Sequence, residues 1–541
     1  MANHATIDKM KLISLTKENT IKTATAILVT TLALSNILGV IRDHFLAQKI
    51  TTDLLDTYYA AFRLPDLIFN VIILGAVSSA FIPTFSTLLS QNKKDEAHRL
   101  ASAVLTIGMV MVLGAIAVLY ILLPWLTQYL VPDFSPEKRQ MTYQLSRLLL
   151  VPPIFFALSY FFSAVLNSYK RFMASSLAPL IYNISIIGAT YLFADRYGVY
   201  AVAWGVIIGA ALHMCIQLIP LRTFSLKLKV AWDTKSSSVR QVGRLMIPRS
   251  IGLGALQIMF VSFTSMASGL GMGAVAILSL ADNIQTMPTV VFGASVATAL
   301  FPTLAQKFSL GKMDDFSKHI EKATTTILYY LVPTAIAVIL LRIQIVRLVL
   351  GSGHFGWDQT VLTAQTLGFF ALSMVFSGLI PLFTRSFYAL HNTRSPTLYA
   401  IVSIIVSIIS ALLFKQWLGV TGLALAFSLG SLVNFTLLYS SLKKHIPDFN
   451  EDAIWAKIPP IIFGTIGMGI AIQITKFALG TVFDLDRFYE VALQAGLASV
   501  FGAAVYFATT YWLGFKDSEL LGFGRIIGFF TGGRSGTRHK T

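Results

Sequence analysis

The sequence carries little charge for its length. Aspartate, glutamate, lysine and arginine make up 12% of its 541 residues, against roughly a quarter in soluble proteins. Because a soluble protein needs a charged, hydrated surface, this shortage excludes a water-soluble globule and leaves no stretch for a soluble catalytic domain. With 55% hydrophobic residues, the sequence instead predicts a protein whose solvent is the lipid bilayer.

Cysteine and the common catalytic motifs are also scarce. Cys215 is the only cysteine, which excludes a disulfide framework, a cysteine-based zinc site and a redox pair. It lies in an apolar run, and we expect a packed core thiol. Residues 1–22 lack the apolar core of a cleaved signal peptide. The sequence contains no P-loop, GxSxG, HExxH or dinucleotide-binding turn in a credible strand-to-helix context. We therefore expect no enzyme, no catalytic residue, no metal site, no cofactor and no transport driven by ATP bound to this chain.

Long apolar runs dominate what is present. Fourteen of them approach or exceed the length needed to cross a bilayer, about 17 to 25 residues. They lie near 23–41, 58–88, 101–123, 143–166, 174–194, 198–219, 246–268, 274–306, 323–341, 361–384, 396–414, 418–441, 459–475 and 489–514. The second and eighth runs are overlong and contain prolines, so we expect tilt, a kink or a flanking turn there.

The runs form two groups of six. Similar basic, aromatic corners follow the fourth run, at 167–171, and the tenth, at 385–394, and each leads to a proline, Pro179 or Pro396. We therefore predict an all-α polytopic membrane protein of about 14 transmembrane helices, with two pseudo-symmetric six-helix lobes around a central cavity plus two C-terminal helices. The expected segments are an N-terminal lobe 1–221, a cytoplasmic basic linker 222–244, a C-terminal lobe 245–442, a pair of spans 443–515 and a basic cytoplasmic tail 516–541.

The net charge of +17 follows the expected topology. Of the 42 lysines and arginines, 29 fall in the alternate segments that include both termini, and ten fall in the other loops. Cytoplasmic loops retain positive charge during insertion, so we expect a multi-pass protein with both termini in the cytoplasm. The charge is dispersed over short loops, which argues against nucleic-acid binding.

A few polar residues lie inside the spans, where a charge is costly unless it meets water or a partner. Arg63 and Asp66 could neutralise each other at i, i+3 or line a cavity. Arg249 could line a cavity or reach the headgroups. For Asp282 and Asn283, deep in the eighth run, we expect a cavity position or a buried hydrogen bond.

Several short motifs, in order along nearly the whole chain, carry a family resemblance. They are 38–43 (LGVIRD), 61–66 (AFRLPD), 246–249 (MIPR), 281–283 (ADN), 353–356 (GHFG) and 385–390 (RSFYAL). The chain resembles the MurJ (MviN) lipid II flippases of the multidrug/oligosaccharidyl-lipid/polysaccharide exporter superfamily.

The resemblance implies movement of lipid II, an undecaprenyl-pyrophosphate glycopeptide, from the inner to the outer leaflet of the bacterial inner membrane by alternating access. Arg42 and Arg63 match positions that would contact the pyrophosphate, and Asp43 and Asp56 would orient or gate them. Arg249 and Asn283 are added on this chain's own chemistry. The two C-terminal helices would form a groove for the lipid tail.

The chain departs from the family at several polar positions. Asn36, Phe69–Asn70 and Asn283 stand where many members have arginine, and Leu74 replaces a frequent glutamate. We therefore expect a less cationic cavity. The expected partners are a lipid-linked glycan pyrophosphate and membrane lipids; a coupling ion and the oligomeric state stay open.

Three other functions are compatible with such a sequence. An exporter of another undecaprenyl-linked glycan, or a multidrug antiporter of the same superfamily, would share the architecture. A membrane scaffold would bind partners without needing Arg42 or Arg63. A membrane glycosyltransferase would need carboxylates in an acid/base geometry that short loops cannot easily build.

Overall fold

A computed structural model of the protein describes residues 21–74, 81–223, 228–446, 449, 451–483 and 487–515. For 21–29, 245, 248 and 249 it describes the backbone and not the side chains. All regular structure in the described residues is helical, which confirms the predicted all-α class. The expected tail 516–541 and most of the N-terminal segment 1–22 lie outside the described residues.

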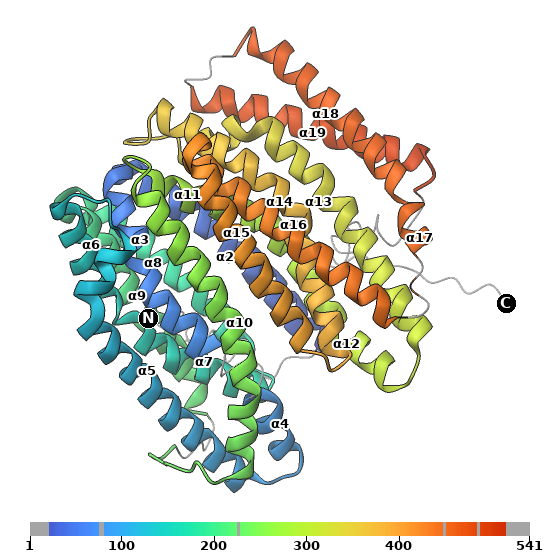
Figure 1. Cartoon of the computed structure of the whole chain (residues 1–541). Coiled ribbons are helices and arrows are strands. Elements are labelled where there is room, and N and C mark those ends of the chain that lie inside the picture. The colour runs from blue at the N-terminus through green and yellow to red at the C-terminus, as the bar shows by residue number, and fades with distance from the viewer. Residues whose placement is uncertain are drawn as a thin grey trace, which may run out of the picture.

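The first group of expected spans forms a bundle that we call the N-lobe (Figure 1). Its elements are α2 (Ile21–Lys49), α3 (Thr52–Ile68), the π-helix η1 (Phe69–Leu74), α4 (Ile82–Ser90), α5 (Lys94–Leu130), α6 (Pro136–Leu149), α7 (Pro152–Ser168), α8 (Met173–Tyr197) and α9 (Val199–Leu221).

The second group forms the C-lobe. Its elements are α10 (Ser237–Ser268), α11 (Ala274–Thr289), the π-helix η3 (Val290–Ala294), α12 (Ser295–Ser309), α13 (Met313–Leu350), α14 (Trp357–Ala389), α15 (Arg394–Leu418) and α16 (Val420–His445). The short α17 (Glu451–Trp455) leads into α18 (Ile458–Gly480) and α19 (Phe488–Trp512). This last pair packs on α13, on the side of the C-lobe away from the N-lobe (Figure 1).

The number of spans agrees with the prediction of about fourteen. Thirteen helical stretches in the described residues are long and apolar enough to cross a membrane. The remaining expected run, 23–41, falls within the 29-residue α2, although the side chains of 23–29 lie outside the described set.

Corresponding turns of the two lobes have the same backbone conformations. In the N-lobe, Gly198 with φ 55° and ψ −138° joins α8 to α9, and in the C-lobe Gly419 with φ 58° and ψ −134° joins α15 to α16. The corners that the sequence singled out turn alike, with φ 59° at Lys170 and 58° at His391. The internal repeat predicted from the sequence is therefore present in the fold.

The two overlong runs are interrupted at matching places. Pro65 lies inside α3, which passes into η1, and Pro288 lies inside α11, which passes into η3. Proline cannot donate the backbone hydrogen bond of an α-helix, and close to each of these prolines the backbone hydrogen bonds change from the α-helical to the π-helical pattern. Both overlong runs thus contain a proline followed by a π-helical segment.

Small residues set the close packing of α8 on α9. A Cβ at Gly205 would lie 2.6 Å from Cβ of Ala189, and one at Gly209 would lie 2.9 Å from the Tyr182 ring.

We expect Gly205→Leu to separate the two helices and to lower the free energy of unfolding by about 1 to 3 kcal/mol, or more. Thermal unfolding in detergent should show this as a lower midpoint. Gly188→Leu on α8 is the matched control, because a Cβ there meets nothing within 4 Å, and an equal loss in both variants would contradict the packing role.

The expectation for Cys215 is wrong. Its side chain on α9 is exposed and is not packed in a core. In a bilayer, the lipid-facing side of a helix is as apolar as the side that packs inward. An apolar run therefore does not reveal which face holds the thiol.

The interface between the two lobes positions the site. On the N-lobe side it is made by α2, α3, α5 and η1, and on the C-lobe side by α10, α11 and α13. One polar contact within it is the hydroxyl of Ser250 on α10, which donates to the Val71 carbonyl on η1 at 2.6 Å. The interface is therefore where the predicted site residues have to be sought.

Candidate functional site

Arg42 and Asp43 form a polar link between the lobes. The Arg42 guanidinium donates to Oδ1 of Asp43 through Nε at 3.0 Å and through Nη2 at 2.8 Å. The other oxygen of Asp43 accepts a hydrogen bond from Nδ2 of Asn283 on α11, at 2.9 Å. One carboxylate thus joins α2 of the N-lobe to α11 of the C-lobe.

The two members of this pair differ in exposure. The Asp43 side chain is 6% exposed and that of Arg42 is 22% exposed. The remaining donor group of Arg42, Nη1, lies 3.3 Å from Oδ1 of Asn183 on α8. Since that contact is long and neutral, Arg42 is the member of the pair able to exchange a partner for an anionic ligand.

Arg63 on α3 also reaches across to the C-lobe. Its Nε donates to the Thr264 hydroxyl on α10 at 2.8 Å, and its Nη2 donates to the Ser279 hydroxyl on α11 at 3.1 Å. The guanidinium also lies 5.3 Å from the centre of the Phe260 ring. No carboxylate lies within ion-pair distance of Arg63 in the described part of the chain. Arg63 and Asp66 therefore form no direct ion pair, although Asp66 and Asp282 lie close enough to attract the Arg63 charge.

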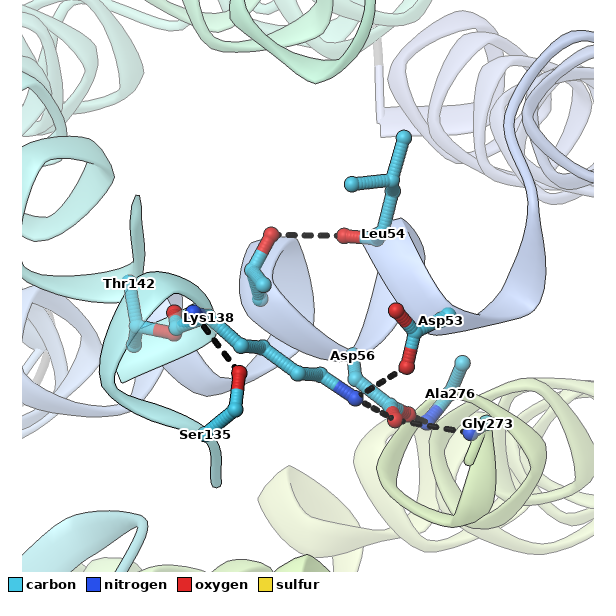
Figure 2. A network of polar contacts seen from close by, with 9 residues as sticks. Asp53, Leu54, Asp56, Ser135, Lys138, Thr142, Gly273 and Ala276 are labelled. Atoms are coloured by element: carbon cyan, nitrogen blue, oxygen red, sulfur yellow. Dashed lines mark hydrogen bonds and ion pairs between the residues drawn. The ribbon is translucent and has the colours of Figure 1, made fainter. Parts of the chain in front are cut away.

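Asp56 is the most enclosed acidic residue of the site. Its side chain is 0% exposed, and one of its oxygens lies 2.7 Å from Nζ of Lys138 on α6. The carboxylate also accepts the backbone N–H groups of Gly273 and Ala276, both at 2.8 Å, at the beginning of α11 (Figure 2). The free N–H groups at a helix N-terminus favour an anion. Asp56 therefore binds the C-lobe as a cap supplied by the N-lobe.

Lys138 completes this arrangement, which we call the Asp56 cluster: Asp53, Asp56, Lys138, Gly273 and Ala276. The ammonium of Lys138 lies 2.6 Å from Oδ1 of Asp53, whose side chain is 43% exposed (Figure 2). Lys138 thus bridges one buried and one exposed carboxylate, and α3, α6 and α11 are held together at one end of the molecule.

A second contact joins the lobes at the end of α2. The backbone N–H of His354 donates to the Gln48 carbonyl at 3.3 Å. Gly353 has φ 59°, and a Cβ there would lie 2.1 Å from that carbonyl oxygen. Only glycine fits this approach, which explains the glycine of the 353–356 motif. Helix α3, which carries Asp56, begins directly after α2 ends. The Asp56 cluster and the contact between Gln48 and His354 therefore lie at the same end of the molecule, where α2 ends and α11 begins.

Most of the predicted residues meet at the interface between the lobes. Arg42, Asp43 and Asn283 are bonded to one another, while Arg63 and Asp56 make separate contacts with the C-lobe. Asp282 makes a partly buried hydrogen bond, in which its Oδ1 accepts from Nε2 of Gln285 at 2.9 Å. The side chain of Arg249 lies outside the described residues.

Sequence reasoning missed the neutral and distant partners. Lys138 was only one of the cations of an outer loop, and Asn183, Thr264 and Ser279 are ordinary polar residues of apolar helices. Among the described residues, no group of three or more histidine, cysteine, aspartate or glutamate side chains could hold a metal ion.

The positions where the family resemblance led us to expect arginine are neutral, and one of them is used for packing. Phe69 packs against the rings of Phe156 and Tyr160. Asn70 donates to the Asp66 backbone carbonyl at 2.9 Å. By contrast, Nδ2 of Asn36 is buried and has no hydrogen-bond partner among the described residues. Asn36 is thus the only one of these positions found to keep an unused donor.

An apolar groove runs between α13 and α18. Its volume is about 470 Å³. Ile336 and Leu340 line it from α13, and Ile466, Gly469 and Ile470 line it from α18. The groove is therefore formed by one of the two C-terminal helices together with α13 of the C-lobe, and α19 supplies none of its lining residues.

Comparison with known proteins decides the family. The family model described as "Lipid II flippase MurJ" matches residues 50–488. The chain belongs to the MurJ family. This MurJ-family region includes Asp56, Arg63, Asn283 and the 353–356 motif, whereas α2, with Arg42 and Asp43, precedes it.

Individual MurJ relatives are distant in sequence but similar in length. The "Probable lipid II flippase MurJ" of Bdellovibrio bacteriovorus is 27% identical over 489 residues, covering 89% of this chain and 92% of that protein. The "Lipid II flippase MurJ" of Burkholderia cenocepacia is 25% identical over 504 residues, covering 89% and 95%.

Solved structures share the fold. A lipid II flippase MurJ in an inward closed conformation superposes with a TM-score of 0.74 at 23% identity, over 90% of this chain and 98% of that one. An inward-facing multidrug-resistance MATE transporter of the MOP superfamily gives 0.66 at 12% identity, over 77% and 95%. The polytopic, two-lobed architecture of this MurJ-family chain is therefore that of helical transporters.

Proposed function

We propose that this protein moves lipid II from the inner to the outer leaflet of the bacterial plasma membrane. Membership of the MurJ family carries the proposal, and the site supports it. Arg42 and Arg63 are two guanidinium groups at the interface of the lobes, and within the described part of the chain Arg63 forms no ion pair with a carboxylate. Arginine is suited to binding phosphate because its planar donors match phosphate oxygens.

The distribution of lysine and arginine indicates which end of the molecule faces the cytoplasm. Both termini and the linker 222–244 belong to the segments that hold 29 of the 42 lysines and arginines, and we place them in the cytoplasm. The Asp56 cluster and the contact between Gln48 and His354 then lie at the outer end. On this assignment the lobes are closed toward the outside.

Transport would proceed by alternating access. The pyrophosphate would enter from the cytoplasmic side and bind Arg63 and Arg42, and Arg42 would exchange its contacts with Asp43 for contacts with the ligand. The loss of that ion pair frees Asp43 and its bond to Asn283, which weakens the link between α2 and α11. Opening at the outer end then requires the Asp56 cluster to separate. The lipid tail stays in the bilayer, along the groove between α13 and α18.

The membrane potential favours this direction. Moving one elementary charge through 100 mV changes its free energy by about 2.3 kcal/mol, so a doubly negative headgroup leaving an inside-negative cell gains about 4 to 5 kcal/mol. A potential of ordinary size is therefore enough to bias export, whether or not an ion is also coupled.

The proposal is tested in cells. A bacterium depleted of its own lipid II flippase would express this chain, and lipid II exposed on the outer leaflet would be measured by its accessibility to an externally added enzyme. We expect exposure to return to the level given by the native flippase. A protein that inserts well and restores no exposure would contradict the proposal and favour another cargo, such as a different lipid-linked glycan.

A further inference from the structure

The basic linker between the lobes lies against α5. The backbone N–H of Lys229 donates to the Ser102 hydroxyl at 3.2 Å, and that of Ala231 donates to the Thr106 hydroxyl at 3.1 Å. Two exposed apolar side chains, Val230 at 93% and Trp232 at 64%, extend from this segment. Tryptophan next to a polar, basic segment is typical of the lipid headgroup layer. Residues 228–236 therefore lie at the surface of the membrane.

An apolar pocket opens beside this segment. It has a volume of about 140 Å³ and lies between η1, α5, α7 and α10. Ile72, Val104, Gly108, Phe161, Val242 and Gly243 are among its lining residues. The glycines make room, because a Cβ at Gly108 or Gly243 would meet nothing within 4 Å. The pocket takes no part in the site of Arg42 and Arg63.

Positive charge gathers at the same place. Lys229, Lys235, Arg240 and Arg244 are all exposed, and none of them lies in an ion pair among the described residues. Arg240 and Arg244 each directly follow a lining residue of the pocket, Val239 and Gly243, on α10.

The acidic residue nearest in sequence does not neutralise this group. Asp233 is the only acidic residue between 228 and 246, and its carboxylate accepts the backbone N–H groups of Lys235 and Ser236, at 3.2 and 3.0 Å. The surface thus offers cations directly beside an apolar cavity, which is the pattern that recognises an anionic lipid.

We propose that this place binds one anionic glycerophospholipid of the cytoplasmic leaflet. Part of one acyl chain would occupy the pocket between α5 and α10, and the phosphate would lie on Arg240 and Arg244, with Lys229 and Lys235 adding to the positive potential. A zwitterionic lipid fills the pocket equally well but gains less from the cations. The lipid would join α5 of the N-lobe to α10 of the C-lobe, whatever the cargo of the transporter is.

Native mass spectrometry of the purified full-length protein tests this proposal. The probes are phosphatidylglycerol and phosphatidylcholine with identical acyl chains. We expect the wild-type chain to bind one phosphatidylglycerol at least about tenfold more tightly than phosphatidylcholine. Equal affinities for the two lipids would overturn the proposal, as would the absence of a tightly bound phosphatidylglycerol.

Two kinds of variant separate the pocket from the charges. Gly243→Leu fills the pocket and should weaken phosphatidylglycerol binding about tenfold, while Gly108→Leu fills it from α5 and guards against misfolding of the first variant. Arg240→Gln with Arg244→Gln should remove the preference for phosphatidylglycerol and leave phosphatidylcholine binding unchanged. The matched control is Gly114→Leu, also on α5. A Cβ at Gly114 likewise meets nothing within 4 Å, and Gly114 is not among the residues that line the pocket. Wild-type affinity in both pocket variants would overturn the proposal.

Discussion

Replacing Arg42 and Arg63 together by alanine is expected to abolish the exposure of lipid II in the cell assay. Both guanidinium groups are at the interface of the lobes, and each charged hydrogen bond to a ligand contributes about 1.5 to 3 kcal/mol. Losing both should reduce the rate of transport by a factor of about 100 or more. Arg42→Ala alone should be severe, since it also removes the ion pair of the buried Asp43.

Arg147→Ala is the matched control for this double variant. Arg147 is exposed, donates to the Tyr120 hydroxyl at 2.6 Å and lies over the rings of Tyr120 and Tyr143, away from the interface of the lobes. Arg147→Ala removes one arginine side chain and its charge from the N-lobe, as each of the two substitutions does, and it should leave transport within about twofold of wild type. Exposure of lipid II that survives in the double variant with normal membrane insertion would show that transport does not depend on these two arginines.

Asp56→Ala is expected to open the outer end of the molecule. It leaves two N–H groups at the start of α11 without their acceptor and leaves Lys138 with Asp53 alone. Removing one partner of a buried ion pair typically costs 3 to 5 kcal/mol. Since about 1.4 kcal/mol corresponds to a factor of ten, the closed state should lose at least about tenfold in population.

A thiol at Thr52 reports this opening. Thr52 is 7% exposed and lies against Gly273, so Thr52→Cys is shielded while the cluster is closed. In a Cys215→Ser background, its reaction with a membrane-impermeant maleimide added from outside should accelerate at least about tenfold when Asp56→Ala is added. Asp53→Asn is the control, because this carboxylate contacts the same lysine from a 43% exposed position and such pairs contribute little. Unchanged reactivity of the Thr52→Cys thiol in the Asp56→Ala variant would show that the Asp56 cluster does not hold the outer end closed.

Much of the fold could be predicted from the sequence because the bilayer imposes length and polarity on every span. The two overlong runs are overlong for a physical reason, since Pro65 and Pro288 each precede a π-helical segment and an extension beyond it. What the sequence could not supply was the direction in which an apolar residue faces. Cys215 shows this, because lipid and protein interior select the same residue types on α9.

The site was predicted in two ways. Arg63 stands out because charge inside a span is costly, whereas Arg42, Asp43 and Asp56 were predicted from their place in the family motifs, and all four lie at contacts within or between the lobes. Lys138 and Asn183 were not recognised, because each is more than 80 residues from its partner along the chain and nothing local marks it. The role of Asp56 as an N-terminal cap of α11 depends on two backbone N–H groups that carry no signal in the sequence.

The most direct test of the central claim is a reconstitution of the purified chain in liposomes. Lipid II with a fluorescent headgroup would be placed in both leaflets, and the fraction reached by a membrane-impermeant quencher would be followed over time with an inside-negative potential imposed. We predict that this fraction rises in liposomes that contain the wild-type chain and stays at the protein-free level with the Arg42→Ala/Arg63→Ala variant. Equal fractions in liposomes with and without the wild-type chain would contradict the claim that this protein moves lipid II.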